Sequence, residues 1–370
     1  MEIVQVKDRS DLEEFIKIPW KIYEGNPYWV PPLVKEQEKV LTHVNPFFKH
    51  AETALFIAKN NSTPLGRIAA IVDYNYQDYC QEKAGAFGFF ESINDFKVAK
   101  ALFDCVVKWL KTKKIEVTIG PLNPSTNEEC GLLVEGFEKD PFIMMPYSHS
   151  YYPQFLEKYG FKKEKDLLAY EFVLERGEES TSKWLALSEK AKEKGIEIRS
   201  INLKNLKNEI GIIQDIYNSA WSKNWGFVPM TDEEMLWMGK RIKPLADPEL
   251  ILIAEVEGTP VGFIMAIPNY NRALKKLNGT LGPIGTMKLL WNSRKIKELR
   301  FITLGIKEEY RRNRYLSLLY YEFTKNAIAK GYKLAEISWI LEDNLNPQNG
   351  IIKHLSGKVS KKYRIYGMKI

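Results

Sequence analysis

Two stretches of the chain share the same pattern of apolar runs around the same turn. Residues 56–75 read FIAKNNSTPLGRIAAIVDYN, and residues 252–271 read LIAEVEGTPVGFIMAIPNYN. Aligned without a gap at an offset of 196 residues, ten of the twenty positions are identical. Each stretch is an apolar run, a turn ending in Thr-Pro-x-Gly and a second apolar run, which predicts a β-hairpin. A repeat period near 200 residues indicates a duplicated domain rather than a solenoid.

The spacing of apolar positions predicts a similar order of elements around each hairpin. In the first copy we predict strands over 3–6, 87–91, 117–120 and 168–174 and helices from about residue 10, from a cap at Asn94 or Asp95, and over 152–158. In the second copy we predict strands over 196–201, 300–306, 334–340 and 363–370, helices over 209–221, from 231, after 315 and around 351–355, and an apolar insertion over 277–290. This order predicts a mixed α/β (α+β) fold, with mainly antiparallel sheets flanked by helices.

A length of 370 residues is typical of two domains. We predict an N-terminal domain over 1–174, a linker and helix over 175–194, and a C-terminal domain over 195–370. The charged, Ser-bearing residues 175–181 are typical of a linker, and residues 183–194 of the helix that follows it.

Composition narrows the class of protein only a little. The chain is 45% hydrophobic and 27% charged, as ordinary globular proteins are. A net charge of +7 permits acidic ligands such as CoA phosphates, nucleic acid or anionic lipid headgroups, but the excess looks widely spread, which favours a solvated surface. Cys80, Cys105 and Cys130 lack metal-ligand spacing, and we find no leader or membrane-spanning apolar run. We therefore expect a reduced, cytoplasmic protein with no stable membrane insertion.

The basic stretch at 305–315, GIKEEYRRNRY, lies between a predicted strand and a predicted helix. A strand that leads a basic loop onto a helix N-terminus attracts anions, because the first N–H groups of the helix are unpaired and its dipole is positive there. We expect the ligand to be a phosphorylated cofactor.

This stretch resembles the acyl-CoA-binding signature R-x-x-G-x-G/A of the GNAT (Gcn5-related N-acetyltransferase) superfamily. The aligned residues are Arg311-Arg312-Asn313-Arg314-Tyr315-Leu316, with Arg314 and Leu316 at the glycine positions. The duplicated order of elements is similar to two tandem GNAT folds. Motifs such as PYWVPP at 27–32 and FGFFE at 87–91 resemble one bacterial group of tandem GNAT-like proteins. The resemblance implies transfer of an acyl group from acyl-CoA to an amine.

The basic stretch places acetyl-CoA or another acyl-CoA on the second copy. The corresponding loop of the first copy, residues 91–95, has two acids and no Arg, so it would repel a pyrophosphate. The expected cofactor contacts are Ile306, Arg311, Arg312, Asn313, Arg314, Tyr315 and Asn344.

The resemblance also implies a base, often a carboxylate, and a Tyr that donates a proton. Neither copy has the expected Tyr, whose position falls on Leu156 and near His354. We predict Glu342 as the general base and His354 as a replacement acid or base, against the alternatives of a solvated loop acid and a structural His. Substrate contacts are predicted at the polar cluster of the first copy, which could instead satisfy a buried turn. Its members are Glu91, Asn123, Ser125, Asn127 and Glu128, and the first four are the predicted contacts.

Two functions stay open. The first is an acyl-CoA-dependent N-acyltransferase, acting as a monomer or homodimer on a small-molecule or lipid-like amine. The second is a catalytically silent GNAT-like binding or scaffolding protein. A gap between the fourth and fifth strands of the second copy would favour the enzyme, and a gap filled by Arg314 or Leu316 the binding protein. We predict no metal, because the four His are scattered and no HExxH or CxxC occurs, and no nucleic acid, because no basic stripe is interleaved with aromatics.

Overall fold

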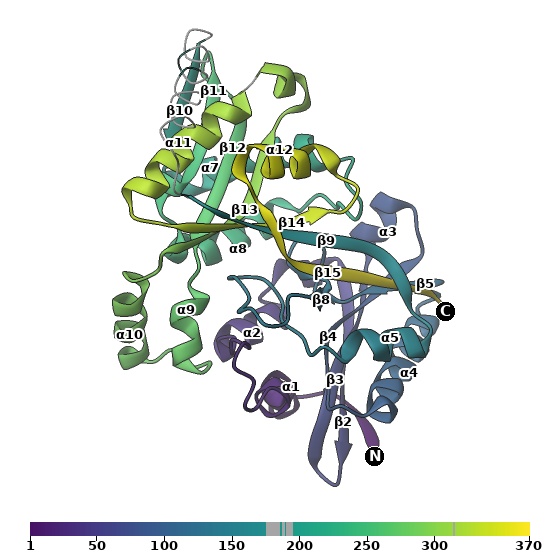
Figure 1. The fold of residues 1–370 in the computed structure, drawn as a ribbon. Coiled ribbons are helices and arrows are strands. Elements are labelled where there is room, and N and C mark those ends of the chain that lie inside the picture. Colours follow the sequence, from purple (N-terminus) through teal and green to yellow (C-terminus); the bar gives the residue numbers. More distant parts are fainter. Residues whose placement is uncertain (175–185, 187–188, 190–194, 314) are drawn as a thin grey trace.

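Two successive sets of strands and helices build the protein (Figure 1). The structure is a computed structural model that describes residues 1–174, 186, 189, 195–313 and 315–370. The strands of the first set are β1 (Glu2–Gln5), β2 (Ala51–Asn60), β3 (Thr63–Asp73), β4 (Ala84–Ser92), β5 (Val117–Gly120), β6 (Leu122–Asn123), β7 (Glu129–Cys130), β8 (Leu132–Glu135) and β9 (Lys162–Val173). Its helices are α1 (Arg9–Ile22), α2 (Val34–Val40), η1 (Pro46–Lys49), α3 (Tyr74–Cys80), α4 (Phe96–Thr112) and α5 (Tyr152–Tyr159).

The second set follows the same plan with an additional helical insertion. Its strands are β10 (Ile196–Ser200), β11 (Ile251–Val256), β12 (Thr259–Pro268), β13 (Glu298–Ile306), β14 (Leu334–Leu341) and β15 (Lys358–Lys369). Its α-helices are α7 (Leu206–Trp221), α8 (Asp232–Ile242), α9 (Asn271–Leu274), α10 (Pro283–Ser293), α11 (Tyr315–Ala329) and α12 (Leu345–Leu355). Its 3-10 helices are η2 (Leu203–Asn205), η3 (Lys243–Leu245), η4 (Pro248–Leu250), η5 (Lys275–Leu277) and η6 (Glu308–Asn313).

The duplicated hairpins pair in the same register. Phe56 lies opposite Ile68 in the first copy, and Leu252 lies opposite Ile264 in the second, which is the same pair moved by the repeat. The register shifts at equivalent places too, after Ala58 and after Ala254. The repeat seen in the sequence is therefore a repeat of structure.

Among the described residues, all strands except β6 and β7 join in one 13-stranded sheet, and β6 and β7 pair with each other. Its order is β1-β2-β3-β4-β5-β15-β9-β14-β13-β12-β11-β10, with β8 beside β15. The pairs are antiparallel except β4–β5 and β13–β14, which are parallel. The last strand of each copy lies beside the fifth strand of the other copy, since β15 pairs with β5 and β9 pairs with β14. Figure 1 shows β9 and β15 crossing the centre of the molecule, where this exchange joins the two copies.

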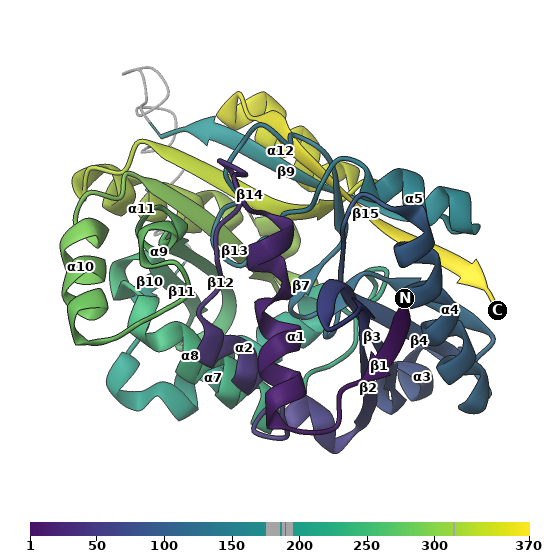
Figure 2. The same cartoon turned by 90° about the horizontal axis from the view of Figure 1, so that it is seen from below.

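Helices cover both faces of each half of the sheet. In the first copy, Leu102 and Phe103 of α4 are buried on one face, and Phe15 and Ile16 of α1 are buried on the other, as Figure 2 shows for the positions of α1 and α4. In the second copy α11 covers one face, while α7 and α8 cover the other. Each half therefore has its own apolar layers, which burial of aliphatic and aromatic side chains stabilises.

Some elements differ from the prediction. Residues 74–80, for which no helix was predicted, form α3, and the apolar insertion contains η5 and α10. The helix predicted around 351–355 begins earlier, at Leu345. β9 and β15 are also longer than predicted, because they pair with each other along most of their length. The predicted linker and helix at 175–194 lie outside the described residues, apart from 186 and 189.

Candidate functional site

In the second copy, β13 and β14 separate part way along their length. Their parallel pairing begins at Glu298–Leu334 and ends at Phe301–Ile337. Beyond that point residues 302–304 are half-buried, and no side chain that the structure describes bonds to their backbone. β13 and β14, the fourth and fifth strands of the second copy, therefore diverge where we expected a gap if the protein is an enzyme.

Leu316 does not fill this divergence. Its side chain is 46% exposed, so it points to solvent at the start of α11. The other residue proposed to fill the gap, Arg314, lies outside the described residues. The arrangement of Leu316 is the one expected of the enzyme rather than of the silent binding protein.

The basic turn follows β13 directly. Ile306 ends that strand and Tyr315 begins α11, and both side chains are 6% exposed. Between them, Arg311 donates from Nη2 to the backbone oxygen of Ala220 at 2.8 Å and from Nε to that of Ile306 at 3.4 Å. Arg311 is exposed, and the first turn of α11 has no acidic residue. The side chains of Arg312 and Asn313 lie outside the described part of the chain, so their cofactor contacts stay predictions.

An aromatic pair of α7 links the end of β13 to the first copy. A Cβ added at Gly305 would lie 2.3 Å from the ring of Trp221, so only glycine allows this close approach. Trp221 stacks on Tyr217 with ring centroids 4.8 Å apart, and the Tyr217 hydroxyl donates to Oδ1 of Asn127 at 3.1 Å. Sequence reasoning missed this connection, because it depends on contacts between distant segments.

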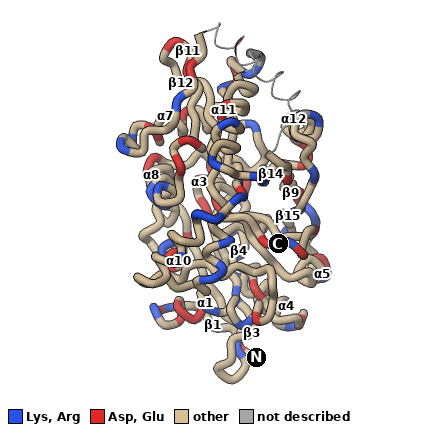
Figure 3. The backbone as a smooth tube through the Cα atoms, turned by 60° about the vertical axis from the view of Figure 1, so that its left-hand side comes forward, with Lys and Arg blue, Asp and Glu red and all other residues tan. Residues whose placement is uncertain are grey.

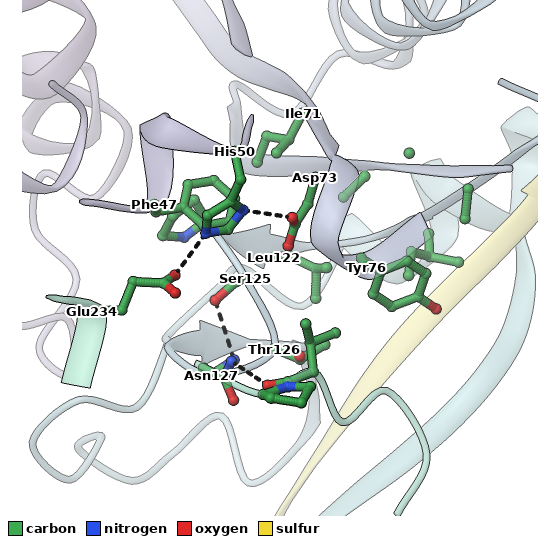
Figure 4. Close-up of a pocket in the computed structure, with 17 residues that line it drawn as sticks. Phe47, His50, Ile71, Asp73, Tyr76, Leu122, Ser125, Thr126, Asn127 and Glu234 are labelled. Carbon is green, nitrogen blue, oxygen red and sulfur yellow. Dashed lines mark hydrogen bonds and ion pairs between the residues drawn. The ribbon is translucent and has the colours of Figure 1, made fainter. Parts of the chain in front are cut away.

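The polar loop predicted to bind substrate lies at the junction of the two copies. Asn127 Nδ2 donates to the Val228 oxygen at 3.0 Å, and Thr126 Oγ1 donates to the Gly226 oxygen at 2.7 Å. Ser125 Oγ accepts from the Asn127 N–H at 3.2 Å. Ser125 and Asn127 line a pocket whose walls come from both copies (Figure 4).

His50 lies in this pocket between two carboxylates, one from each copy (Figure 4). Its Nδ1 is 2.9 Å from Oδ1 of Asp73, and its Nε2 is 3.1 Å from Oε1 of Glu234, as an ion pair. Burial lowers the pKa of His50, but hydrogen bonds and charges from Asp73 and Glu234 outweigh burial and raise the pKa to about 9. The imidazolium and two carboxylates leave one net negative charge, which suits a cationic guest.

Glu128 follows Asn127 in the loop at the junction of the two copies, and its carboxyl has an unusual pKa. Burial raises its pKa to about 7, and the nearby Arg241 guanidinium only partly opposes this effect. The two groups meet at 3.3 Å between Arg241 Nη1 and Glu128 Oε2. A carboxyl that titrates near neutrality can accept a proton from a substrate. Glu128 belongs to the predicted polar cluster of the first copy, but its burial could not be predicted, since it depends on α8 of the second copy.

Glu91, predicted to bind substrate, lies in a separate cluster inside the first copy. Its Oε2 accepts a hydrogen bond from the Tyr152 hydroxyl at 2.8 Å. Burial raises the pKa of Glu91 to about 7, while the charge of Arg67 and the bond from Tyr152 act in the opposite direction. Glu91 is not among the residues that line the junction pocket, so the structure does not bring it together with Ser125 and Asn127.

The first copy fills the place where its own fourth and fifth strands separate. β4 and β5 pair only from Ala84–Val117 to Ala86–Ile119. The predicted substrate residue Asn123 lies beyond this point, where its Oδ1 accepts from the Phe89 N–H at 2.6 Å.

The loop also packs closely against β4, since a Cβ at Gly88 would be 1.7 Å from the Leu122 oxygen. At the start of α4, Asp95 accepts from the Lys97 N–H, which places a carboxylate where an anion would bind.

Glu342 follows β14 as predicted, but its carboxylate is already engaged. Oε1 accepts from the Asp166 N–H at 3.0 Å, and Oε2 accepts from Lys163 Nζ at 2.5 Å. These contacts hold β14 to the exchanged strand β9. Asn344 precedes α12 and makes no side-chain capping bond to it. The side chain of His354 lies outside the described part of the chain, so the catalytic roles of Glu342 and His354 stay predictions.

Two further searches of the described residues found nothing. No group of three or more His, Cys, Asp or Glu in that part of the chain could hold a metal ion. No helix there is long and apolar enough to cross a membrane.

Comparison with solved structures shows the fold. A tandem GNAT protein from the clavulanic acid biosynthesis pathway aligns with 100% of this chain and 98% of its own, with a TM-score of 0.58 and 10% identity. A GCN5-related N-acetyltransferase from Sphaerobacter thermophilus aligns with 99% of this chain and 95% of its own, with a TM-score of 0.54 and 11% identity. The tandem GNAT-like fold expected from the sequence is therefore confirmed.

Sequence comparison finds nearer relatives over nearly full length. Protein YghO of Escherichia coli (strain K12) is 34% identical over 369 residues, which cover 98% of this chain and 94% of that protein. The bacterial ceramide synthase of Caulobacter vibrioides (strain NA1000 / CB15N) is 32% identical over 379 residues, which cover 99% of this chain and 97% of that protein. No family model matches the chain.

Proposed function

Since this chain belongs to the bacterial family that includes protein YghO and a ceramide synthase, we propose that it transfers an acyl group from acyl-CoA to a lipid-like amine. A ceramide synthase relative supports acyl transfer, and the tandem GNAT-like fold is consistent with an acyl-CoA donor. The observation that carries the proposal is the divergence of β13 and β14 directly before a basic turn and a helix start.

The donor belongs on the second copy. Acyl-CoA supplies an activated thioester, and the chain supplies groups that fit its phosphates. Arg311 is exposed at the turn, and the acid beside it, Glu308, is paired with Lys223 at 2.8 Å. The positive end of the α11 dipole adds to the attraction for phosphate. Ile306 and Tyr315, both buried, would fix the two ends of this turn.

The acceptor amine belongs at the junction of the copies. The net negative charge around His50 attracts an ammonium group. Glu128 does not line this pocket itself but directly follows Asn127, which does, and the charge of Glu234 contributes to its raised pKa. We assign Glu128 as the base that accepts a proton from the amine nitrogen, which frees the nitrogen lone pair for attack. Apolar residues in the same pocket suit the stem of a lipid-like amine; they include Ile71, Ala86, Ile119, Leu122 and Val228.

The silent binding protein is the second candidate. It is favoured by the engagement of two predicted site residues with protein groups, Glu342 with Lys163 and Arg311 with the Ala220 oxygen. Such contacts give both residues a structural role without any substrate.

An amide-forming assay separates the two candidates. The purified chain would be incubated with acetyl-CoA or a long-chain acyl-CoA and either a long-chain sphingoid amine or ethanolamine, with free thiol and amide measured together. We expect amide and thiol in equal amounts with the long-chain amine. Binding of a donor without release of thiol would favour the silent protein instead.

A further inference from the structure

The segment that contains α10 is basic and has no acidic residue. Residues 269–297 contain seven Lys and Arg and no Asp or Glu. The whole chain has 54 Lys and Arg and 47 Asp and Glu, and a second acid-free stretch, residues 344–370, contains six Lys and Arg. Figure 3 shows basic and acidic residues interspersed along most of the backbone.

The same segment contains the largest group of exposed apolar side chains on one helix. In α10 the exposed fractions are 71% for Ile284, 72% for Met287, 61% for Leu290 and 63% for Trp291. At about 100° per residue these four side chains share one face of the helix, spanning roughly a third of its circumference. Leu281, just before the helix, is 40% exposed.

The opposite face of α10 packs against the rest of the insertion. A Cβ added at Gly285 would lie 3.8 Å from a side-chain atom of Leu277, and Asn292 Oδ1 accepts from Lys276 Nζ at 3.1 Å. The helix is thus inverted relative to an ordinary surface helix, since its small and polar residues face the protein and its large apolar residues face outward. Figure 2 shows α10 as the outermost helix here, with α9 between it and the body of the molecule.

Ion pairs and a hydrogen bond hold the base of the insertion against the rest of the protein. Arg272 pairs with Asp140 at 2.8 Å and with Glu298 at 2.7 Å, and Lys275 pairs with Asp140 at 2.8 Å. On the side of α1, Trp20 Nε1 donates to Asn278 Oδ1 at 2.9 Å. These contacts hold the orientation of the exposed face relative to both copies.

Three of the other five basic residues of the segment lie around that face. Lys288 lies within α10, and Arg294 and Lys295 follow it directly; all three are exposed. None of the three makes an ion pair with a described residue, and Lys295 lies 5.9 Å from the centre of the Trp291 ring. An apolar face bordered by unpaired cations is the arrangement that lies in the headgroup layer of an anionic membrane.

We propose that α10 and the cations beside it dock the protein onto an anionic lipid surface. Leu281, Ile284, Met287, Leu290 and Trp291 enter the headgroup boundary, and Lys288, Arg294 and Lys295 contact lipid phosphates. This is surface binding, compatible with the lack of a membrane-crossing helix among the described residues. The docking is inferred from α10 alone and does not require acyl transfer, although a lipid-like acceptor would be reached from such a surface.

Vesicle co-sedimentation tests the docking without any need for turnover. The full chain would be mixed with vesicles of phosphatidylcholine alone or of phosphatidylcholine with phosphatidylglycerol. We expect binding to the anionic vesicles, weakened as salt is raised. A variant with Ile284→Gln, Met287→Gln and Trp291→Gln should bind vesicles at least about tenfold more weakly, because it loses the apolar area that would be buried in the membrane. A variant with Lys288→Gln, Arg294→Gln and Lys295→Gln should lose the preference for anionic vesicles.

A matched control removes three exposed apolar side chains elsewhere. Val44, Ile328 and Ile352 are 65%, 41% and 52% exposed, and their replacement by Gln should leave vesicle binding unchanged. Circular dichroism would confirm that all variants keep the fold. Equal binding by the α10 variant and the control would overturn the proposal. So would a dimer in light scattering that the α10 substitutions convert to monomer, since a second copy would then cover this face.

Discussion

In the first copy, the chain itself fills the space between the fourth and fifth strands. In the second copy, β13 and β14 diverge beyond Phe301–Ile337, and the buried Arg300 side chain bonds to Ser338 across the start of this divergence. Asn123 bonds to the Phe89 N–H in the first copy, and Asp95 caps the helix that follows. In the second copy, no described side chain bonds to the backbone of residues 302–304, and the helix start has no acid. The two copies thus share one fold, but the space between the fourth and fifth strands is closed in the first copy and more open in the second.

From this difference we infer that the two copies have different roles. The second copy would bind the acyl donor, while the first copy contributes the loop that contains Ser125, Asn127 and the buried carboxyl of Glu128. The exchanged strands β9 and β15 make the two copies mechanically dependent on each other. The predictions below test each part of this division.

The largest effect is expected at Glu128. Glu128→Gln should lower acyl transfer about a hundredfold or more, because a positioned base contributes on that order. In the unsubstituted protein the rate should rise as pH increases through about 7, where burial places the pKa of Glu128, since the base must be deprotonated. The pH–rate profile of the variant should lose this rise.

Glu91→Gln is the matched control for Glu128. Its carboxyl also has a pKa of about 7, but it bonds to Tyr152 inside the first copy, whereas Glu128 contacts Arg241 of the second copy. We expect a rate within about twofold of the original, as for a group outside the reacting atoms. A larger loss in Glu91→Gln than in Glu128→Gln would move the reaction into the first copy and reverse the comparison.

A smaller effect, on stability, is expected where the first copy is closed. Asn123→Ala leaves the buried Phe89 N–H without its acceptor, which should lower the free energy of unfolding by about 1–3 kcal/mol. Urea denaturation would measure this change. Asn346 of the second copy also precedes a Pro, but it is exposed in α12, and Asn346→Ala should cost under about 0.5 kcal/mol. Equal losses at both positions would contradict the asymmetry.

The smallest effect is expected at the ion pairs that join the copies. Glu234→Gln keeps the capping box with Thr231 but removes the charge beside His50, and should cost about 1 kcal/mol at pH 7. Because the pKa of His50 is raised to about 9 from its usual 6.5, this stabilisation is complete below pH 6.5 and disappears as pH rises through 9.

Glu233→Gln is the matched control for Glu234. The pair between Glu233 and Lys49 is mostly exposed, with side-chain exposures of 58% and 68%, so its loss should change stability by about 0.5 kcal/mol at most. Thermal unfolding of both variants at several pH values would check this. A pH-independent loss in Glu234→Gln would show that His50 is not the group that titrates.

The parts of the fold that could be predicted are those that short local sequence patterns determine. The Thr-Pro-x-Gly turns marked both hairpins, and Asp95 was one of two predicted caps for α4. These signals work because a turn or a cap is decided by a few neighbouring residues. The exchange of β9 and β15 has no such signal, since it depends on pairing between strands about 200 residues apart.

The candidate site was predictable only in part for the same reason. The basic turn at 305–315 was visible because its charge and its place between a strand and a helix are local. His50 was not singled out, and the raised pKa of Glu128 could not be predicted, because the pKa values of both depend on Arg241 or Glu234 from the other copy. Glu342 was chosen for its place after β14, but the sequence could not show its pairing with Lys163.

Donor binding tests the central claim most directly. Thermal unfolding would be measured with CoA, acetyl-CoA and a long-chain acyl-CoA, for the original chain, for Arg311→Ala at the turn of the second copy, and for Lys97→Ala at the helix start of the first. A ligand at 100 times its dissociation constant stabilises the native state by about 2.7 kcal/mol. We predict such a ligand-induced shift in the original chain and in Lys97→Ala, and its loss in Arg311→Ala. No shift with any donor, or loss of the shift in Lys97→Ala instead, would contradict the account.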